Sequence, residues 1–247
     1  MTASAEGRGM AELAALLADG TRASICVALL DGRAWTAGEL ARRAGVARST
    51  ASDHLTRLVR GGLLVEERQG RHRYLRLAGP SVAQLIEDLA GHAPAAPAPT
   101  RSLRAATATA ALAYARTCYD HLAGRLGVLM YDALLAERRL DRSSGLTLTP
   151  DGWAWVAGLG VPVDVLRAAR RPVVRDCLDW TERRPHLAGA LGATLCRRFT
   201  DLGWISQGAG RAIRVTPTGR AGLAEALAIP EHTLDPPVAP PPTSGRA

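Results

Sequence analysis

Apolar side chains recur at helical spacing through most of the chain, and short runs of alternating residues interrupt them. The pattern is clearest over residues 36–77, where one helix ends near Gly45 and a second begins near Ala47. The apolar positions of the second helix follow an i, i+4, i+7, i+8 pattern at Ala51, Leu55, Leu58 and Val59. A strand begins at Leu63, turns at Gln69 and Gly70, and returns through Tyr74 to Leu77. Two helices, a tight turn and a hairpin predict a winged helix-turn-helix.

Other segments of the first half also show the period of an amphipathic helix. Helices are predicted over residues 10–18, 21–30 and 81–90, with Asp-Gly pairs or a proline at their ends. The expected fold class is therefore mainly α with small β-hairpins. Residues 1–91 form the predicted winged helix-turn-helix domain.

The outer face of the second helix and the tip of the hairpin carry the chemistry that DNA binding requires. A helix in the major groove needs short hydroxyls for phosphates and longer polar side chains for base edges. On the helix we expect DNA contacts from Arg48, Ser49, Thr50, Ser52, His54 and Arg57. On the hairpin we expect Arg68, Arg71 and Arg73 to contact phosphates or the minor groove. The alternative for the hairpin is a solvated turn, but the preceding helix-turn-helix favours a DNA-contacting wing.

Three stretches carry a family resemblance: ADGTRASICVALLDG, ELARRAGVARSTASDHLTRLVRGGLL and VEERQGRHRYLRL. Together they resemble the DNA-binding domain of the arsenic-repressor (ArsR/SmtB) family, over about a third of the chain. The resemblance implies a homodimer that binds an operator, usually as a repressor released by an inducer. The family's cysteine motif is absent from the first helix of the turn, which reads TAGELARR. The last helix offers Asp88 and His92 without the remaining ligands of the family's zinc pattern.

The second half begins after a linker of alanine and proline at residues 92–102. An alanine-rich helix is predicted from Leu103 to about Leu126. Residues 103–229 form a predicted effector-sensing and dimerisation domain. The proline-rich tail at 230–247 is expected to be disordered.

This second domain contains an internal repeat. The sequence HLAG occurs at 121–124 and again at 186–189, and LTLTPDG at 146–152 is echoed by IRVTPTG at 213–219. Two matches in register predict a duplication, with copies at about 104–161 and 167–229. Each copy is expected to hold a helix running into HLAG, a second helix (129–140; 195–202), a hairpin and a closing helix. Each copy could be a small winged-helix relative, or the pair could form a platform with a binding site along its pseudo-twofold.

The repeat places a cysteine before each HLAG histidine. Cys118 lies three residues before His121, a spacing that shares one face of a helix, and Cys177 lies nine before His186. Cysteine and histidine are ligands for zinc or another thiophilic ion. The predicted metal ligands are Cys118, His121, Cys177 and His186, and the nearby carboxylates are Asp120, Asp176 and Asp179. The alternative is that the cysteines are small core residues and the histidines cap turns, and we expect Cys26 and Cys196 to be core.

Composition narrows the class of protein. A net charge of +8, from 31 basic and 23 acidic residues, favours a nucleic-acid partner, although arginine-rich usage is also typical of high-GC bacterial genomes. Four cysteines without CxxC spacing do not predict a disulfide framework. No run of ~18 apolar residues predicts a membrane span. The start of the chain lacks the pattern of a secretory leader, so we expect a cytoplasmic protein with no membrane partner.

The function expected from these patterns is a bacterial DNA-binding transcriptional regulator. It would be a homodimeric repressor of a palindromic operator in double-stranded DNA, released by a metal ion or small effector in the C-terminal domain. No hydrolase, phosphate-loop or zinc-protease motif is present, so an enzyme is not expected. The alternatives are a fused enzyme domain or a thiol-redox sensor. The tryptophans and tyrosines of the second half form core or line an apolar ligand pocket.

Overall fold

The computed structural model describes residues 4–70, 72–93 and 103–236. The chain divides into two compact units, Met1–Leu89 and Ala90–Ala247. Most of the predicted linker and of the predicted tail, together with Arg71, lie outside the described residues. Within them, no single helix is long and apolar enough to cross a bilayer. The helices Ala5–Leu17 and Gly20–Asp31, bent by 83° at their break, meet the length and composition requirement only as a pair.

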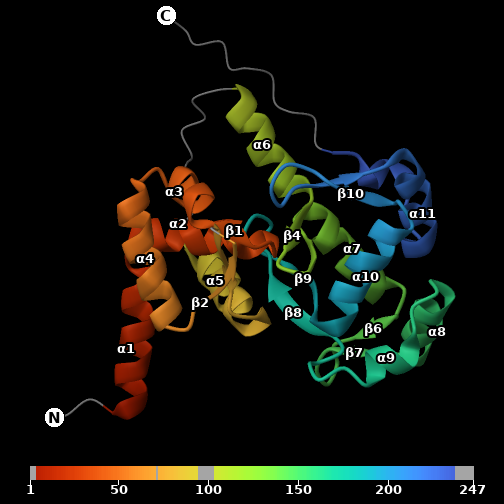
Figure 1. Ribbon diagram of the computed structural model, residues 1–247. Helices are drawn as coiled ribbons and strands as arrows, with labels where there is room; N and C mark the ends of the chain where they lie inside the picture. Colours follow the sequence, from red (N-terminus) through yellow and green to blue (C-terminus); the bar gives the residue numbers. More distant parts are fainter. Residues whose placement is uncertain (1–3, 71, 94–102, 237–247) are drawn as a thin grey trace, which may run out of the picture. The chain divides into compact units, whose positions relative to one another are not determined.

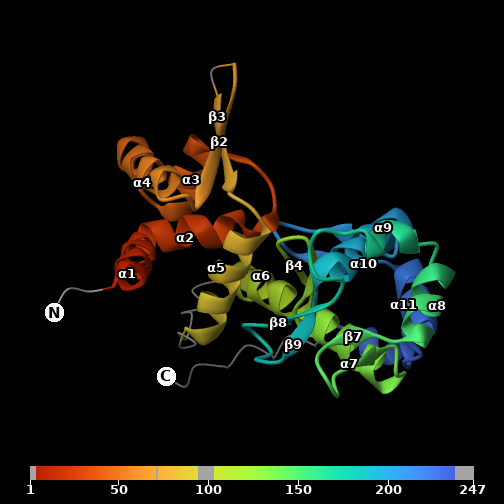
Figure 2. The same ribbon diagram turned by 90° about the horizontal axis from the view of Figure 1, so that it is seen from below.

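The first unit is a winged helix-turn-helix, as predicted (Figure 1). Its elements are α1 (Ala5–Leu17), α2 (Gly20–Ala28), η1 (Leu29–Asp31), β1 (Trp35–Thr36), α3 (Ala37–Ala44), α4 (Arg48–Arg60), β2 (Leu64–Gln69) and β3 (His72–Leu77). Helix α5 (Pro80–His92) follows the hairpin. The three strands form one antiparallel sheet in the order β1-β3-β2. Figure 2 shows the hairpin β2–β3 projecting beyond α3 and α4.

Local sequence explains the turn between α3 and α4. Thr36 and Glu39 form a reciprocal capping box that begins α3. Gly45 ends the helix at φ 69°, a left-handed conformation that glycine adopts without steric cost. Leu40 and Leu55, from the two helices, are then both fully buried in one core.

The second unit runs through the same order of elements twice. The first half holds α6 (Leu103–Tyr114), β4 (Arg116–Cys118), β5 (His121–Ala123), α7 (Arg125–Ala136), β6 (Leu140–Asp141), β7 (Thr147–Leu148) and α8 (Pro150–Gly158). The second half holds α9 (Val163–Arg167), β8 (Arg175–Leu178), β9 (Pro185–Ala188), α10 (Gly189–Asp201), β10 (Ile205–Gln207), β11 (Ile213–Val215) and α11 (Pro217–Leu227), and a 3-10 turn, η2 (Glu231–Leu234), follows it. This repeated order supports the predicted duplication. In each half a long helix leads into a two-stranded hairpin, α7 into β6–β7 and α10 into β10–β11, as α4 leads into β2–β3 in the winged helix.

The HLAG segments were expected to end helices, and this expectation was wrong. Each forms the second strand of a two-stranded antiparallel hairpin, β4–β5 or β8–β9. Helix α6 accordingly ends at Tyr114 rather than near residue 126, and the next helices begin at Arg125 and Gly189, earlier than predicted. At the end of each hairpin a glycine with positive φ lies against backbone carbonyls, Gly124 at 77° and Gly189 at 85°. A side chain at either position would collide with those carbonyls, so the two glycines permit the strand-to-helix turn.

In each half, the helix after the HLAG hairpin packs against the HLAG hairpin of the other half. Helix α7 of the first half packs on β9 of the second, and α10 of the second packs on β5 of the first. The shared core includes Leu122, Leu126, Leu187 and Leu191. Because each helix covers the other half's hairpin, both hairpins face the centre of the unit.

Candidate metal centre and DNA-binding surface

The four predicted ligands come together where the two HLAG hairpins meet. Cys118 pairs directly with His121 across β4–β5, and Cys177 pairs directly with His186 across β8–β9. Residues directly opposite in an antiparallel pair project from the same face of the sheet. Each hairpin therefore presents one thiol and one imidazole, and the expectation that Cys118 and His121 share a helix face was wrong in its geometry.

The distances within this cluster are short. The sulfur atoms of Cys118 and Cys177 lie 3.7 Å apart, and the Nε2 atoms of His121 and His186 lie 3.1 Å apart. One ligand atom from each of the four residues lies within 4.8 Å of the others. A tetrahedral zinc ion with bonds of about 2.3 Å to sulfur and about 2.0–2.1 Å to nitrogen requires separations of roughly 3.8 Å between sulfurs and roughly 3.3 Å between nitrogens. The sulfur–sulfur and nitrogen–nitrogen separations are close to these values.

The cluster is closed to solvent. The four side chains belong to residues that are 0–5% exposed. Closed sites with four protein ligands are typical of structural or sensory zinc, whereas catalytic zinc keeps one position open for water. The arrangement is therefore suited to binding an ion and not to activating a water molecule.

Each histidine has an aspartate behind it. Asp120 lies 3.1 Å from Nδ1 of His121, and Asp179 lies 3.9 Å from Nδ1 of His186. Both aspartates stand two residues after a cluster cysteine. At His121 this carboxylate is within hydrogen-bond distance, so it holds the ring with Nε2 toward the other ligands and makes the imidazole a stronger ligand. At His186 the separation is longer than a hydrogen bond, and Nδ1 is buried without a hydrogen-bond partner among the described residues. Asp176, the other predicted carboxylate, bonds Tyr131 and Arg142 instead.

Asp179 also stabilises the turn of the opposite half. It accepts the backbone N–H of Gly124 at 2.6 Å and forms a fully buried ion pair with Arg116 at 2.9 Å. Burial raises the pKa of this carboxyl, but the Arg116 charge and the hydrogen bonds outweigh burial and hold the pKa well below its usual value. The guanidinium of Arg116 lies 4.7 Å from the ring centre of Trp180. One carboxylate thus ties the two hairpins together behind the ligands.

Two glycines let α7 and α10 lie close to the HLAG strand of their own half, and each glycine also lies beside the histidine of the opposite half. A Cβ on Gly127 would lie 2.6 Å from the carbonyl oxygen of Leu122 and 3.6 Å from Cβ of His186. A Cβ on Gly192 would lie 2.5 Å from the carbonyl oxygen of Leu187 and 3.2 Å from Cβ of His121. These are the last glycines of the two repeats HLAGxLG. The four-residue match HLAG does not include these two glycines, so it did not indicate their role in packing.

The cluster favours a thiolate at Cys177. A hydrogen bond from Cys118 lowers the pKa of Cys177 far below its usual value, and interactions with both histidines add to this effect against the cost of burial. Burial lowers the pKa of His121, but hydrogen bonds to Asp120 and Cys177 raise it to about 9. Thiolate is the form of cysteine that binds metals. Metal binding would then release the protons that remain on the cluster.

The predicted DNA-reading residues of α4 are mostly on its open face. Arg48, Ser49, Thr50, Ser52 and Arg57 are exposed. His54 differs, because its side chain is only 16% exposed and its Nδ1 lies 3.4 Å from Arg22 and 3.8 Å from Asp19. His54 is therefore less open to DNA than the other predicted α4 contacts, because its ring packs toward α2 within the domain.

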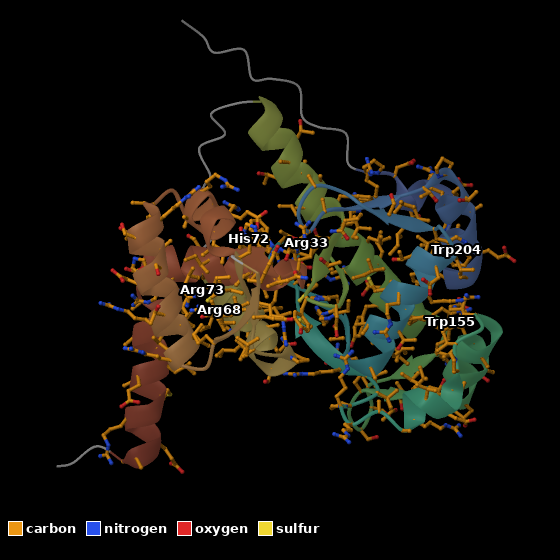
Figure 3. All side chains as sticks on the ribbon, in the orientation of Figure 1. Arg33, Arg68, His72, Arg73, Trp155 and Trp204 are labelled. Carbon is orange, nitrogen blue, oxygen red and sulfur yellow. The ribbon has the colours of Figure 1, made fainter. Side chains whose placement is uncertain are left out.

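The wing carries fewer free charges than its sequence indicates. Glu66 on β2 pairs with Arg68 at 3.1 Å and with Arg73 at 2.7 Å (Figure 3). A hollow of about 430 Å³ beside the wing is lined by Arg42, Arg48, His72 and Arg73 among other residues. Arg42 was not among the predicted DNA contacts, because its position on the first helix of the turn has no pattern that distinguishes it from an ordinary solvated arginine.

The aromatic residues of the second unit are divided between several environments. Trp155 and Trp204 line one cavity of about 440 Å³ (Figure 3). Trp153 stacks under Arg167 at 4.7 Å, and Tyr131 belongs to the core. These aromatic residues therefore do not line one shared pocket. The alternative prediction, that most of them lie in the core or pack on the surface, agrees better with the structure.

Comparison with known proteins identifies one relative over most of the chain and others over its first part. Residues 17–67 match a family described as a helix-turn-helix domain. An uncharacterized HTH-type transcriptional regulator of Bacillus subtilis, YdfF, is 40% identical over 222 residues, which cover 89% of this chain and 97% of that protein. The HTH-type transcriptional regulator CmtR of Mycobacterium tuberculosis is 41% identical over 80 residues, 32% of this chain and 67% of that protein.

A solved structure described as the cadmium metal-sensor CMTR from Mycobacterium tuberculosis is 38% identical, with a TM-score of 0.30 over 38% of this chain and 99% of that chain. These relatives are named as transcriptional regulators and not as enzymes. Because the likeness to YdfF extends along nearly the full length of both proteins, the chain belongs to the HTH-type transcriptional regulators, and its DNA-binding domain is of the arsenic-repressor (ArsR) type.

Proposed function

We propose that this regulator is a homodimeric repressor whose DNA binding is controlled by a metal ion held by Cys118, His121, Cys177 and His186. The observation that carries the proposal is the convergence of these side chains, from two halves of one domain, with ligand atoms within 4.8 Å of one another and S–S and N–N separations close to those of a tetrahedral ion. A hydrogen-bonded histidine pair or a buried cysteine pair would explain part of this arrangement. Neither explains all four groups meeting at one point.

The chemistry of the ligands favours zinc or a softer thiophilic ion. Two thiolates and two imidazoles suit zinc, whereas hard ions such as magnesium prefer oxygen ligands. A metal effector also has a precedent in CmtR, whose solved structure is described as that of a cadmium metal-sensor. CmtR matches this chain over 80 residues, so this precedent does not locate the site.

The DNA-binding half of the proposal rests on α4 and the wing. Arg48, Ser49, Thr50, Ser52 and Arg57 would contact the major groove, and Arg68, Arg71 and Arg73 would contact the backbone or minor groove. A twofold dimer would read a palindrome whose half-sites lie about 10 bp apart or a multiple of that. A regulator that binds chromosomal DNA acts in the bacterial cytoplasm, and we propose that location for this chain.

The metal would act by fixing how the two HLAG hairpins meet. An effector shifts a conformational equilibrium only if it binds one conformation more tightly than the other. A four-coordinate ion meets this condition, because it binds well only when β4–β5 and β8–β9 bring their ligands together. The second unit, which also holds the predicted dimerisation surface, would then set the spacing of the DNA-reading helices.

Metal content and operator binding of the purified protein test this proposal together. We expect elemental analysis to find one zinc or similar ion per chain, and that ion to release the protein from its own promoter in a gel-shift assay. The double variant Cys118→Ser/Cys177→Ser should lose both the ion and the release, whereas Cys196→Ser, a core cysteine outside the cluster, should keep both. A metal response that survives the double substitution would exclude these residues as the sensor.

The DNA-binding face is tested separately. Arg57→Ala should abolish the specific shift on the promoter while leaving the metal content unchanged. Arg60→Ala, on the same helix and equally open to solvent, removes the same charge near the end of the helix and should weaken binding only modestly. Equal loss in the two variants would mean that charge, rather than base contact by α4, accounts for binding.

A thiol-redox sensor is the second candidate, because only 3.7 Å separates the sulfurs of Cys118 and Cys177. Oxidation would join them in a disulfide and remove both thiolates from the metal. Thiol titration of the unfolded protein after mild peroxide treatment distinguishes the two candidates. A redox sensor loses two thiols with a matching change in operator binding even without metal, whereas a metal sensor responds to zinc with all four thiols reduced.

A further inference from the structure

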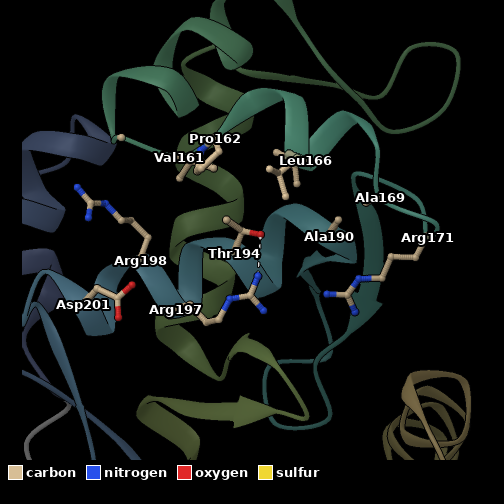
Figure 4. A pocket seen from close by; sticks show the side chains of 12 residues that line it. Val161, Pro162, Leu166, Ala169, Arg171, Ala190, Thr194, Arg197, Arg198 and Asp201 are labelled. Carbon is tan, nitrogen blue, oxygen red and sulfur yellow. Dashed lines mark hydrogen bonds between the residues drawn. The ribbon is translucent and has the colours of Figure 1, made fainter.

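A second cavity in the C-terminal unit lies outside the metal cluster. It has a volume of about 440 Å³, within the range of about 300–1,000 Å³ that is usual for small-molecule sites. It lies between α9 with its following loop and α10 (Figure 4). Volume alone does not indicate a ligand, so the argument depends on the chemistry of its walls.

One wall of this cavity is apolar. It is formed by Val161, Pro162, Val165, Leu166, Ala169 and Ala190. Val165 is 71% exposed, which makes it one of the most exposed large apolar side chains of the described residues. Single exposed apolar residues are common, but this one borders a hollow that other apolar side chains also line. An apolar group of a ligand would cover it.

The other wall is basic. Arg171, Arg197 and Arg198 line the cavity, and Asp201 is the acidic residue on its lining. Figure 4 shows Arg171 and Arg197 directing their guanidinium groups toward each other, with Asp201 at the opposite end near Arg198. Arg197 bonds the hydroxyl of Thr194 at 3.2 Å, and within the part of the chain that the structure describes no carboxylate pairs with it. Two guanidinium groups that face each other favour an anion between them.

Arg171 connects this cavity to the metal cluster. Its Nη1 lies 2.7 Å from Asp120, and the other oxygen of Asp120 lies 3.1 Å from Nδ1 of His121. One guanidinium edge is therefore used by Asp120, and its remaining N–H groups can bind a second carboxylate. An anion that shares Arg171 would weaken the hold of Arg171 on Asp120 and make Asp120 a stronger acceptor for His121.

We propose that this cavity binds a small organic acid, with its carboxylate between Arg171 and Arg197 and its apolar body against Val165 and Leu166. Binding is coupled to the metal through Arg171, Asp120 and His121, so this part of the inference rests on the proposed function. Because a stronger hydrogen bond from His121 Nδ1 to Asp120 holds the ring with Nε2 toward the metal, acid and metal strengthen each other's binding. The coupling is equal in both directions, as linkage requires.

Isothermal titration calorimetry of the full chain with octanoate tests the pocket. We expect saturable binding of octanoate, and little binding of octanol, which lacks the charge, or of inorganic phosphate, which lacks the apolar body. Arg197→Gln should weaken octanoate binding at least about tenfold, because it removes one of the charged donors to the carboxylate. Arg170→Gln, which removes an exposed arginine outside the cavity, should bind as the wild type does. Absence of octanoate binding, or equal binding by Arg197→Gln, would overturn the proposal.

The coupling is tested by zinc titration against a competing chelator. Saturating octanoate should tighten zinc binding about fivefold in the wild type and not in Arg171→Gln. If zinc does not bind at all while octanoate does, the proposed metal site fails and the pocket stands. If zinc binds normally and octanoate does not, the pocket fails and the metal site stands.

Discussion

At the scale of single residues, the geometry of the Cys/His cluster depends on the groups packed behind its four side chains as well as on those side chains. Asp120 is hydrogen-bonded to His121, Asp179 lies 3.9 Å from His186, and Gly127 and Gly192 let their helices approach the backbone of the HLAG strands. Both pairs follow the internal repeat. Each half therefore supplies one cysteine, one histidine, one aspartate and one glycine to a single site.

The role of Asp120 leads to a prediction about affinity. Asp120→Asn keeps the size of the side chain but removes its charge, so it should weaken zinc binding by about tenfold or more, as is typical for carboxylates behind metal-bound histidines. Competition with a chromogenic chelator measures this. Asp132→Asn removes an equivalent charge from a half-exposed pair with Arg184 and should leave zinc affinity unchanged.

The role of Gly127 leads to a prediction about stability. Gly127→Ala forces a shift against the carbonyl of Leu122 and should lower the free energy of unfolding by about 1–3 kcal/mol. Gly158→Ala is the matched control, since it also adds a methyl group to a helix but meets nothing within 4 Å. It should be neutral or stabilising by up to about 1 kcal/mol. Thermal or urea unfolding compares the two, and a stabilised Gly127→Ala would contradict the close packing of α7 against Leu122.

At the scale of elements, local sequence predicts the winged helix better than the domain that follows it. The capping box at Thr36, the turn at Gly45 and the apolar stripe of α4 act within a few residues, so their pattern predicts the structure directly. The HLAG hairpins have strands of only three or four residues, and packing against helices of the opposite half stabilises them. No local pattern carries that information, and a helical spacing was inferred instead.

The four residues of the cluster were nevertheless grouped from the sequence, because the repeat relates the two HLAG histidines and a cysteine precedes each of them. Cys118 and His121 are three residues apart, whereas Cys177 and His186 are nine residues apart. On a helix these two spacings would place the paired side chains differently. In a hairpin both pairs are cross-strand partners, and the longer loop of β8–β9 accounts for the difference. The partial burial of His54 was not predicted, because its contacts with α2 depend on tertiary packing.

The ion pairs of Glu66 on the β2–β3 hairpin lead to a prediction about DNA binding. Glu66→Gln releases Arg68 and Arg73 from their ion pairs and should tighten non-specific DNA binding, with a salt dependence steeper by about one phosphate contact. Glu67→Gln changes the net charge equally on the same strand but lies outside those pairs. Fluorescence anisotropy over a range of salt concentrations compares them. Identical salt slopes would show that Glu66 does not restrain the wing.

At the scale of the whole molecule, the metal is expected to link the two halves of the C-terminal unit. A ligand that binds the folded state and not the unfolded state stabilises it by about 4 kcal/mol at a thousandfold excess over its dissociation constant. Zinc should therefore raise the unfolding temperature of the wild type and leave that of Cys118→Ser/Cys177→Ser unchanged. Calorimetry measures both. An equal rise in the two proteins would locate the stabilising ion elsewhere.

The central claim is that one ion is coordinated by two cysteines and two histidines at the junction of the repeated hairpins. X-ray absorption spectroscopy at the zinc edge of the purified, zinc-loaded protein tests it most directly. The account predicts a four-coordinate shell of two sulfur atoms at about 2.3 Å and two nitrogen atoms at about 2.0–2.1 Å. A shell of only nitrogen and oxygen atoms, or the same spectrum after Cys118→Ser/Cys177→Ser, would contradict it.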